Sequence, residues 1–424
     1  MSCSGLNLLS LDQALAHYAE VKTLSSVRLP LIEAHQHILA ESVVSPVSLP
    51  LFTQSAVDGY ALRSEDIAAG RTTFELIGEI RAGIEEHLEI DAGQAVRIFT
   101  GGKLPASADT VARQEIISRH DDHITLNENL AVGSDIRYQG EELQQGTVLA
   151  QPGQVLHSGL IAALSMAGVK QVSVSRQPKI AVLITGDEVS TQLDNEAKVF
   201  DANAPMIITW LKEQGYDIHD PAQVMLQHVI DDEPILRAAL QHAMQNYDLV
   251  ITTGGVSVGD YDLIRPVSMG LGAEEIFWKV AQKPGKPLYF AHYQQQAQHD
   301  LQHNQDQSHS HSSYLLGLPG NPAAVLVCLS VHVSTLMRAL QGIFDPRPQW
   351  QKALFSEDVK IDSREQLLRM RLSSDDQGQM RVAKLGKQQS HMLSNLSQAN
   401  VIVRIPAKSQ LQTDLKHVDF IRIE

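Results

Sequence analysis

The 424-residue sequence contains only two cysteines, Cys3 and Cys328, which lie far apart in the chain. Neither belongs to a C-x-x-C pair, so neither a disulfide framework nor a cysteine-based zinc site is supported. The chain also has no run of roughly 18 uninterrupted apolar residues, the length a membrane-spanning helix needs. Its first residues lack the basic and apolar segments of a signal peptide. We therefore expect a cytoplasmic protein of a reducing compartment, with no membrane partner.

Positive charge is scarce as well, because 34 Lys and Arg face 49 Asp and Glu, a formal net charge of -15. This balance disfavours nonspecific attraction to nucleic acid. The motifs G-x-x-x-x-G-K-[ST] and G-x-G-x-x-G do not occur, which disfavours P-loop and dinucleotide-binding folds. An anionic ligand would therefore need a local cluster of Lys, Arg, backbone N–H groups or a bound cation.

A chain of this length exceeds what one hydrophobic core usually organises, so two to four domains are expected. Between residues 179 and 340 buried-strand patterns alternate with helical ones, which predicts a parallel sheet with right-handed crossovers. In this part Asn203 is expected to cap a helix over 204–214. Asp231 or Asp232 is expected to cap the next helix, and a long helix should begin at Pro322.

Other parts of the chain have a different pattern. Short β-rich runs separated by glycine-containing turns predict a small, mostly-β domain over about 72–149, and the chain becomes β-rich again from about Pro346. The N-terminal part begins with a short helix after Ser10, followed by extended backbone. The Gln/His-rich segment 293–313 is expected to be a solvated, disordered insertion in a hairpin.

Three glycine-containing loops follow the predicted parallel strands. KIAVLIT is followed by Gly186, Asp187 and Glu188, DLVITT by residues 254–260, and LLGL by residues 319–322. The carboxyl ends of parallel strands meet at one edge of a sheet, where ligands usually bind. Backbone N–H groups on such loops suit a phosphate, and the carboxylates suit a divalent cation bound to it. Any one such loop alone is more often ordinary turn structure.

The motifs in these loops resemble those of a known family. The central motifs of the MoeA/gephyrin E-domain family are matched by TGDE at 185–188, TTGGVSVGDYD at 252–262, KVAQKPGKP at 279–287 and GLPGNP at 317–322. Its N-terminal motifs are matched, in order, by AVDGYAL at 56–62, FTGGKLPASADTV at 99–111 and RYQGEEL at 137–143. The matches span nearly the whole chain, whereas the simpler MogA-like adenylyltransferases share only the central domain.

The resemblance implies a multidomain α/β fold with a central, parallel-sheet, MogA-like domain flanked by small mostly-β domains. The expected domains are 1–50 plus 142–177 (helical and extended), 51–141 (mostly β), 178–343 (pterin-binding α/β) and 344–424 (C-terminal β). It also implies a homodimer that inserts molybdate into adenylylated molybdopterin and releases AMP. A divalent cation, expected to be Mg²⁺, would assist. The implied partners are a MogA-type adenylyltransferase and apo-molybdoenzymes.

Site residues carried over from the family fall into three groups. The resemblance implies catalytic roles for Asp58, Thr100, Glu142, Asp187, Glu188, Lys279 and Lys283. It implies metal binding by Glu188, by Asp231 or Asp232, and by Asp260 or Asp262. It implies substrate binding by Thr185, Gly186, Asp201, Asn203, Gly254, Gly255, Ser257, Gly259, Lys286, Pro319, Gly320, Asn321, Pro322, Arg369 and Ser390.

Three features of this set matter for mechanism. The lysines of KVAQKPGKP would supply the positive field that the whole chain lacks. Asp58 and Thr100, with Arg97 nearby, resemble residues that reach across the dimer into the partner's cleft. Glu142 departs from the family, which commonly has Asp there, so its carboxylate is displaced by one methylene.

Two alternatives remain open from the sequence. An adenylyltransferase acting on the same pterin would consume ATP instead of releasing AMP from a preformed adenylate. A non-catalytic dimeric scaffold or pterin carrier, like the receptor-anchoring gephyrin E domain, would bind without turnover. Intact carboxylates and lysines on each loop favour a working enzyme.

Overall fold

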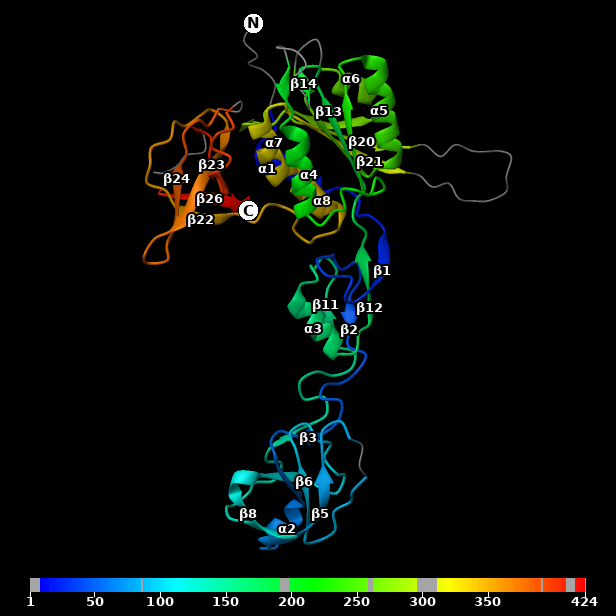
Figure 1. Cartoon of the computed structure of the whole chain (residues 1–424), viewed down its shortest axis with the longest axis vertical. Coiled ribbons are helices and arrows are strands. Elements are labelled where there is room, and N and C mark those ends of the chain that lie inside the picture. Colours follow the sequence, from blue (N-terminus) through cyan, green and yellow to red (C-terminus); the bar gives the residue numbers. More distant parts are fainter. Residues whose placement is uncertain are drawn as a thin grey trace, which may run out of the picture. The chain divides into compact units, whose positions relative to one another are not determined.

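The computed structural model describes residues 8–84, 87–190, 198–257, 262–295, 311–389, 392–408 and 416–423. The chain divides into two compact units, one of residues 27–174 and one of residues 1–26 with 175–424. Figure 1 labels the elements of both, and each unit is described by itself. The predicted site residues Gly259, Asp260 and Ser390, and most of the 293–313 insertion, lie outside the described residues.

The larger unit contains a six-stranded sheet with the strand order β16-β13-β17-β21-β20-β18. In chain order its strands are β13 (Ile180–Thr185), β16 (Val224–Val229), β17 (Leu249–Thr253), β18 (Glu274–Trp278), β20 (Tyr289–Gln294) and β21 (Ser312–Leu318). The strands β16, β13, β17 and β21 are parallel, as predicted. At one edge β20 pairs antiparallel with β21, as the predicted hairpin requires, and it also pairs antiparallel with β18. A hairpin connection without a crossover helix requires that direction.

Helices cover both faces of this sheet (Figure 1). Along β13, Ile180 and Val182 pack in one core cluster, whereas Ala181 and Leu183 pack in another, as the alternation of a strand requires. The first cluster includes side chains of α1 (Leu11–Ala19), α4 (Asn203–Glu213), α7 (Pro322–Cys328), the π-helical turn η2 (Leu329–Val333) and α8 (Ser334–Leu340). The second includes side chains of α5 (Glu233–Asn246) and α6 (Ile264–Gly270). Burial on both faces explains why these strands are continuously apolar in sequence.

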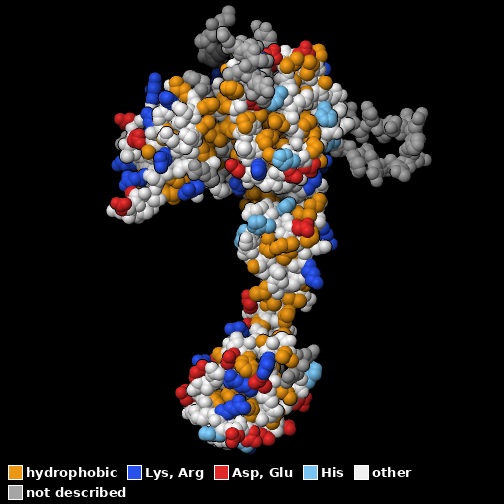
Figure 2. Space-filling view, in the orientation of Figure 1, with side chains coloured by type: hydrophobic (Ala, Val, Ile, Leu, Met, Phe, Trp, Pro, Cys, Tyr) orange, Lys and Arg blue, Asp and Glu red, His pale blue; other side chains and the backbone are white. Residues whose placement is uncertain are grey.

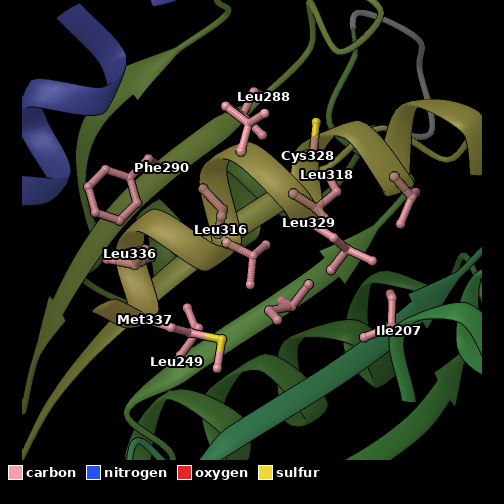
Figure 3. Packing of buried hydrophobic residues seen from close by; sticks show 14 of the residues in the cluster. Ile207, Leu249, Leu288, Phe290, Leu316, Leu318, Cys328, Leu329, Leu336 and Met337 are labelled. Carbon is pink, nitrogen blue, oxygen red and sulfur yellow. The ribbon is translucent and has the colours of Figure 1, made fainter. Parts of the chain in front are cut away.

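The helical stretch Pro322–Leu340 is the most apolar part of this core. This stretch of 19 residues is long and apolar enough to span a membrane by length and composition alone. However, about 78% of it is buried inside the protein. Figure 3 shows Leu329, Leu336 and Met337 of this stretch packed with Leu316 and Leu318 of β21. Such burial is that of the core helix of a globular domain.

Helix starts in this unit follow capping chemistry. Ser10 and Gln13 form a capping box at α1, the helix predicted after Ser10. Asp232, one of the two predicted candidates, caps α5 by accepting from the N–H of Ile235. The prediction that Asn203 caps α4 is wrong, because Asn203 is already helical and the side chain of Asp201 accepts from its N–H. Because it does not cap the helix, the Asn203 amide is able to bond with the loop after β21.

A second six-stranded sheet forms the C-terminal part of the same unit, in the order β19-β23-β24-β22-β26-β25. Its strands are β19 (Gln282–Lys283), β22 (Gln351–Leu354), β23 (Glu365–Ser374), β24 (Met380–Lys384), β25 (Val401–Ile405) and β26 (His417–Arg422). Strand β19 belongs to the KVAQKPGKP segment and pairs parallel with β23. That pairing attaches the C-terminal β domain to the loop that carries the predicted anion-binding lysines. A short parallel pair, β14 (Val189–Ser190) and β15 (Val199–Phe200), completes the unit.

The smaller unit contains the mostly-β region and a helical, extended region. Its six-stranded sheet has the order β7-β4-β6-β5-β9-β8. The strands are β4 (Gly59–Leu62), β5 (Thr73–Ile80), β6 (Gln94–Ile98), β7 (Thr110–Arg113), β8 (Ile117–His120) and β9 (His123–Leu126), with α2 (Ser64–Ala68) and the 3₁₀ turn η1 (Gln114–Ile116) between them. The helical, extended region contains α3 (Ser158–Met166) and three two-stranded pairs. These are β1 (Ser26–Pro30) with β12 (Gln171–Ser175), β2 (Val43–Val44) with β11 (Val148–Ala150), and β3 (Gln54–Ser55) with β10 (Ile136–Arg137).

Candidate functional site

The carboxyl ends of β13, β17 and β21 lie side by side and bring the starts of three loops together. Thr185 Oγ1 donates a 2.8 Å hydrogen bond to the carbonyl of Thr253. The N–H of Gly254 donates to the carbonyl of Leu318 over 3.0 Å. Gly254 has a φ of +85°, and a Cβ there would lie 2.9 Å from Thr185 Oγ1. Only glycine fits this crossing point, because both the backbone conformation and the close neighbour exclude a side chain.

Asn203 links the start of α4 to the loop after β21. Its Nδ2 donates to the carbonyl of Gly320 over 2.8 Å. Its Oδ1 is buried and has no hydrogen-bond partner in the described part of the chain. Asp201 holds this helix start by accepting from the N–H groups of Asn203 and Ala204, at 2.8 and 3.1 Å, and its other oxygen lies 2.8 Å from His228 Nε2. A buried acceptor without a donor is costly, so the Asn203 amide is a position where a donor of a ligand would be stabilised.

The predicted carboxylates gather around Asp231. The N–H of Asp231 donates to Asp187 Oδ1 over 3.1 Å. Burial raises the pKa of Asp231, and the negative charges of Asp187, Glu188 and Asp262 raise it further. Asp232 serves instead as the helix cap, so Asp231 is the member of the pair that faces the other carboxylates.

Whether this cluster suits a divalent cation can be judged from its donors. Among the described residues, no three His, Cys, Asp or Glu side chains form a preassembled metal site. Mg²⁺ in phosphate-binding proteins usually takes one or two carboxylates and completes its octahedron with water and substrate phosphate. The mutually repelling carboxylates around Asp231 fit that open mode of binding.

A cavity of about 680 Å³ lies between the central sheet domain and the C-terminal β domain. Its lining combines the KPGKP loop, the PGNP loop and the C-terminal sheet: Lys283, Pro284, Gly285, Lys286, Pro287, Pro319, Asn321, Ala324, Arg364, Gln366, Leu368, Lys384, Leu385, Gly386, Lys387, Gln388 and Gln389. Five of these residues are cationic and none is acidic. In the view of Figure 2, Lys and Arg side chains are numerous on the C-terminal β domain, although the chain as a whole is acidic. We call this space the anion cavity.

The three predicted lysines do not share one environment. Lys283 and Lys286 line the anion cavity. Lys283 Nζ also lies 2.9 Å from Asp362 Oδ2, and this hydrogen bond is the main reason that the pKa of Asp362 falls to about 2. Lys279 is not among the residues that line the cavity, and its Nζ lies 3.5 Å from the ring centroid of Trp278 in a cation–π contact. Lys279 is thus held by an aromatic face, at a φ of +74°.

Arg369 is buried beneath residues that line the anion cavity and bonds to their backbone. Its side chain is 1% exposed, and its Nε donates to Asn395 Oδ1 over 3.0 Å. Its Nη2 donates to the carbonyls of Lys387, Gln389 and Met392. The guanidinium is therefore occupied by protein acceptors and holds the backbone at Lys387, Gln389 and Met392.

Three of the predicted residues, Asp58, Thr100 and Glu142, belong to the smaller unit. Asp58 Oδ1 accepts from the N–H and the hydroxyl of Thr100, at 2.9 and 2.8 Å, and these bonds lower the pKa of Asp58. Arg97 lies over the rings of Tyr60 and Phe99. Glu142 is an exposed residue of the connecting segment, where its N–H donates to the carbonyl of Leu49.

Three cations of the anion cavity, Arg364, Lys384 and Lys387, were not predicted from the sequence. Lys384 and Lys387 are the first and last residues of the segment KLGK at the end of β24. Two lysines beside a glycine suggest anion binding only when the structure shows that the segment lines a cavity. Trp278, which holds Lys279, was missed as well. Its position directly before a lysine was the available signal.

The α/β domain combines a glycine-rich rim and carboxylates with an adjoining cationic cavity. These features define the class of multidomain proteins whose sites suit a multiply charged anion. Three family models match in order. They are the MoeA N-terminal region (domain I and II) over residues 9–168, the probable molybdopterin binding domain over 181–339 and the MoeA C-terminal region (domain IV) over 352–413.

Similar proteins cover nearly the whole chain. A molybdopterin molybdenumtransferase of Staphylococcus epidermidis is 32% identical over 405 residues, covering 94% of this chain and 90% of the relative. One from Staphylococcus aureus is 31% identical, covering 92% of this chain and 89% of the relative. The molybdopterin biosynthesis MoeA protein of Pyrococcus horikoshii is similar in structure, with a TM-score of 0.76, 25% identity and coverage of 98% of this chain and 99% of that one. The chain belongs to the MoeA family of molybdopterin molybdenumtransferases.

Proposed function

We propose that this protein inserts molybdate into adenylylated molybdopterin, with release of AMP, in the biosynthesis of the molybdenum cofactor. The relatives that cover nearly the whole chain carry the name of this activity. The observation that carries the proposal is the anion cavity, because it places five cations, including Lys283 and Lys286, beside the PGNP loop of the sheet rim. A tetrahedral dianion such as molybdate would be stabilised there in a chain whose net charge is otherwise -15.

The pterin and its phosphates are assigned to the sheet rim. Backbone N–H groups of the loops after β13, β17 and β21 would donate to phosphate oxygens, and the unpaired Asn203 Oδ1 would accept from a ligand donor. Asp187, Glu188, Asp231 and Asp262 would hold a divalent cation, which supplies charge neutralisation of the phosphoanhydride when bound. The chain needs no Ser or Cys nucleophile for this chemistry, since positioning and electrostatic stabilisation carry most of the rate in phosphoryl chemistry.

The proposal also covers the oligomeric state of the protein and its cellular location. We assign Asp58 and Thr100 to the cleft of a partner subunit in a homodimer, where the fixed, ionised carboxylate of Asp58 would orient a polar group of the substrate. The protein would act in the cytoplasm, receiving its substrate from an adenylyltransferase of the MogA type and passing the cofactor to apo-molybdoenzymes. Binding to nucleic acid or membrane has no part in this function.

The decisive experiment incubates the purified protein with adenylylated molybdopterin, molybdate and Mg²⁺. AMP release and activation of an apo-molybdoenzyme are both expected. Consumption of ATP on addition of free molybdopterin would favour the adenylyltransferase instead. Tight pterin binding with no AMP would favour a carrier or scaffold.

A matched pair of variants tests the assignment of the carboxylates. Asp187→Ala with Glu188→Ala should leave folding intact, because both side chains are exposed, and should abolish metal-dependent AMP release. The control is Asp217→Ala with Asp220→Ala, which removes the same charge from the same domain. Undiminished AMP release by the first double variant would remove this assignment.

A further inference from the structure

A buried chain of hydrogen bonds connects α1 to the loop that carries Lys283 and Lys286. The hydroxyl of Tyr18 in α1 lies 3.1 Å from His332 Nδ1. His332 Nε2 lies 2.9 Å from Gln282 Oε1, and Gln282 Nε2 donates to the carbonyl of Gly285 over 3.3 Å. Tyr18, Gln282 and His332 are each 0% exposed. The chain of bonds therefore ends on the turn between the two lysines of the anion cavity.

The chemistry of these groups fixes the direction of every bond. The carbonyl of Gly285 can only accept, so the Gln282 amide must donate its N–H to it and present Oε1 to the histidine. His332 must then donate from Nε2, which leaves Nδ1 to accept from the hydroxyl of Tyr18. Burial lowers the pKa of His332 to about 3, so the ring is neutral at ordinary pH and has one donor and one acceptor. One tautomer satisfies the whole chain.

The turn is fitted closely to the Gln282 amide. Gly285 has a φ of +94°, and a Cβ there would lie 2.4 Å from Gln282 Nε2 and 3.0 Å from Cys328 Sγ. No other residue could occupy that position without moving the amide or the turn. The position of the backbone between Lys283 and Lys286 is thus set by the Gln282 side chain.

His332 reaches Gln282 from an unusual part of its helix. It lies in the π-helical turn Leu329–Val333, which separates α7 from α8. A π turn is rare, and such turns inside α-helices are frequently found at functional sites. A buried polar chain is also a poor source of stability, because apolar residues of the same shape would serve a core equally well.

We propose that Gln282, His332 and Tyr18 are positioning residues that hold the 282–286 turn so that Lys283 and Lys286 face the anion cavity. This proposal rests on the proposed function. It adds that the position of the 282–286 turn determines the affinity for molybdate. None of the three residues is among those that line the anion cavity. They act on it through the turn.

The test compares three variants in the full-length protein. His332→Leu keeps an apolar side chain but removes both hydrogen bonds, whereas His332→Gln offers an amide oxygen to Tyr18 and an amide N–H to Gln282. Thr335→Val is the matched control, because it removes a buried hydrogen bond from the next turn of the same helix, to the carbonyl of Val331, with no link to the loop. Tyr18→Phe, which removes one hydroxyl, replaces His332→Leu if that variant does not fold.

Two readouts separate positioning from general stability. Hydrogen exchange of the peptide 280–288 should accelerate in His332→Leu and stay at the wild-type rate in His332→Gln and Thr335→Val. The Kd for molybdate alone, measured by calorimetry, should rise on the order of tenfold in His332→Leu, a change of about 1.4 kcal/mol. The KM for molybdate should rise with it while kcat changes little.

The possible outcomes are distinguishable. Equal exchange and equal molybdate affinity in His332→Leu and Thr335→Val would overturn the positioning role, as would failure of His332→Gln to restore either. Faster exchange of the turn in His332→Leu, restored in His332→Gln, supports the role even if the wild-type protein binds no molybdate. In that case the proposed function fails and the positioning network stands.

Discussion

The ammonium group of Lys283 lies 2.9 Å from Oδ2 of Asp362, so the loop of the sheet domain and the C-terminal β domain meet in an ion pair at the edge of the anion cavity. Asp362 is not itself a lining residue, but its charge offsets that of Lys283. Each anion that binds in the cavity must compete with this carboxylate for the lysine. The pair therefore sets how much of the cavity's positive charge a ligand experiences.

Replacing Asp362 with Asn should strengthen molybdate binding a few-fold at low ionic strength, because a nearby negative charge is removed. The gain should shrink as salt is added, since the pair is partly exposed and screened. Calorimetry at two salt concentrations measures both effects. Asp419→Asn is the control, because Asp419 forms a similar 2.9 Å pair with Lys352 in the same sheet and neither residue lines the cavity. Equal affinities in Asp362→Asn and the wild type would argue against Lys283 as a ligand of the anion.

A second prediction concerns pH. The pKa of His332 is lowered to about 3 by burial, whereas an unfolded histidine titrates near 6.5. Between these values the unfolded chain binds a proton that the folded one does not, so the free energy of unfolding falls as the pH falls below about 6.5. The slope from this residue approaches about 1.4 kcal/mol per pH unit.

His332→Gln should remove that slope, and Thr335→Val should retain it. Urea unfolding between pH 7.5 and 5, followed by tryptophan fluorescence, provides the measurement. All three tryptophans, Trp210, Trp278 and Trp350, lie in the larger unit with His332, so the signal reports on the correct part of the chain. The same pH dependence in His332→Gln and wild type would contradict the assigned burial.

The parts of the fold that the sequence predicted are those fixed by local pattern. Six consecutive residues of β13 are buried, and such a run indicates a strand covered on both faces. The hairpin of β20 and β21 was expected from the sequence, but the pairing of β18 with β20 was not, because the direction of a short strand depends on its connections and neighbours. Pattern indicates a strand, whereas pairing depends on the whole sheet.

The same distinction holds for the site. Asp187 and Lys283 were predicted because they lie in loops that follow strands or match family motifs. Arg364 and Lys387 reach the anion cavity only through the pairing of β19 with β23, a contact between segments far apart in sequence. The choice between Asp231 and Asp232 also depended on the structure. A shift of one residue in the start of α5 would exchange the carboxylate that caps the helix and the one near Asp187.

A third prediction follows from the carboxylates around Asp231. Replacing Asp187 with Asn removes one of the charges that raise the pKa of Asp231, so that pKa should fall toward its ordinary value. Part of the shift should persist, because burial is its largest cause. Carbon-detected NMR titration of the Asp231 carboxyl measures the change. An unchanged titration would place Asp187 too far away to share a cation with Asp231.

The last prediction tests the proposal that two subunits of a dimer contribute residues to one active site. Asp58 lies in the smaller unit of the chain and Asp187 in the larger one, so each can be removed without altering the other's unit. Asp58→Ala and Asp187→Ala should each abolish AMP release as pure homodimers. If one cleft takes Asp58 from one subunit and Asp187 from its partner, a mixed dimer has one cleft with both residues intact. Random pairing of equal amounts then gives about a quarter of wild-type activity, since half the dimers are mixed and half their clefts are complete.

The control for that experiment mixes Asp187→Ala with Glu188→Ala. These two changes damage the same sheet rim, so no exchange of subunits yields a cleft with both carboxylates. Activity should return in the first mixture and not in the second. If differently tagged chains are co-expressed and the mixed dimer is purified through both tags, the first mixed dimer should have about half of wild-type activity, because one of its two clefts is complete. If each cleft were built from one chain alone, the mixed dimer of Asp58→Ala and Asp187→Ala would carry one lesion in each cleft and would stay inactive. Recovery of activity therefore requires that the residues come from two chains.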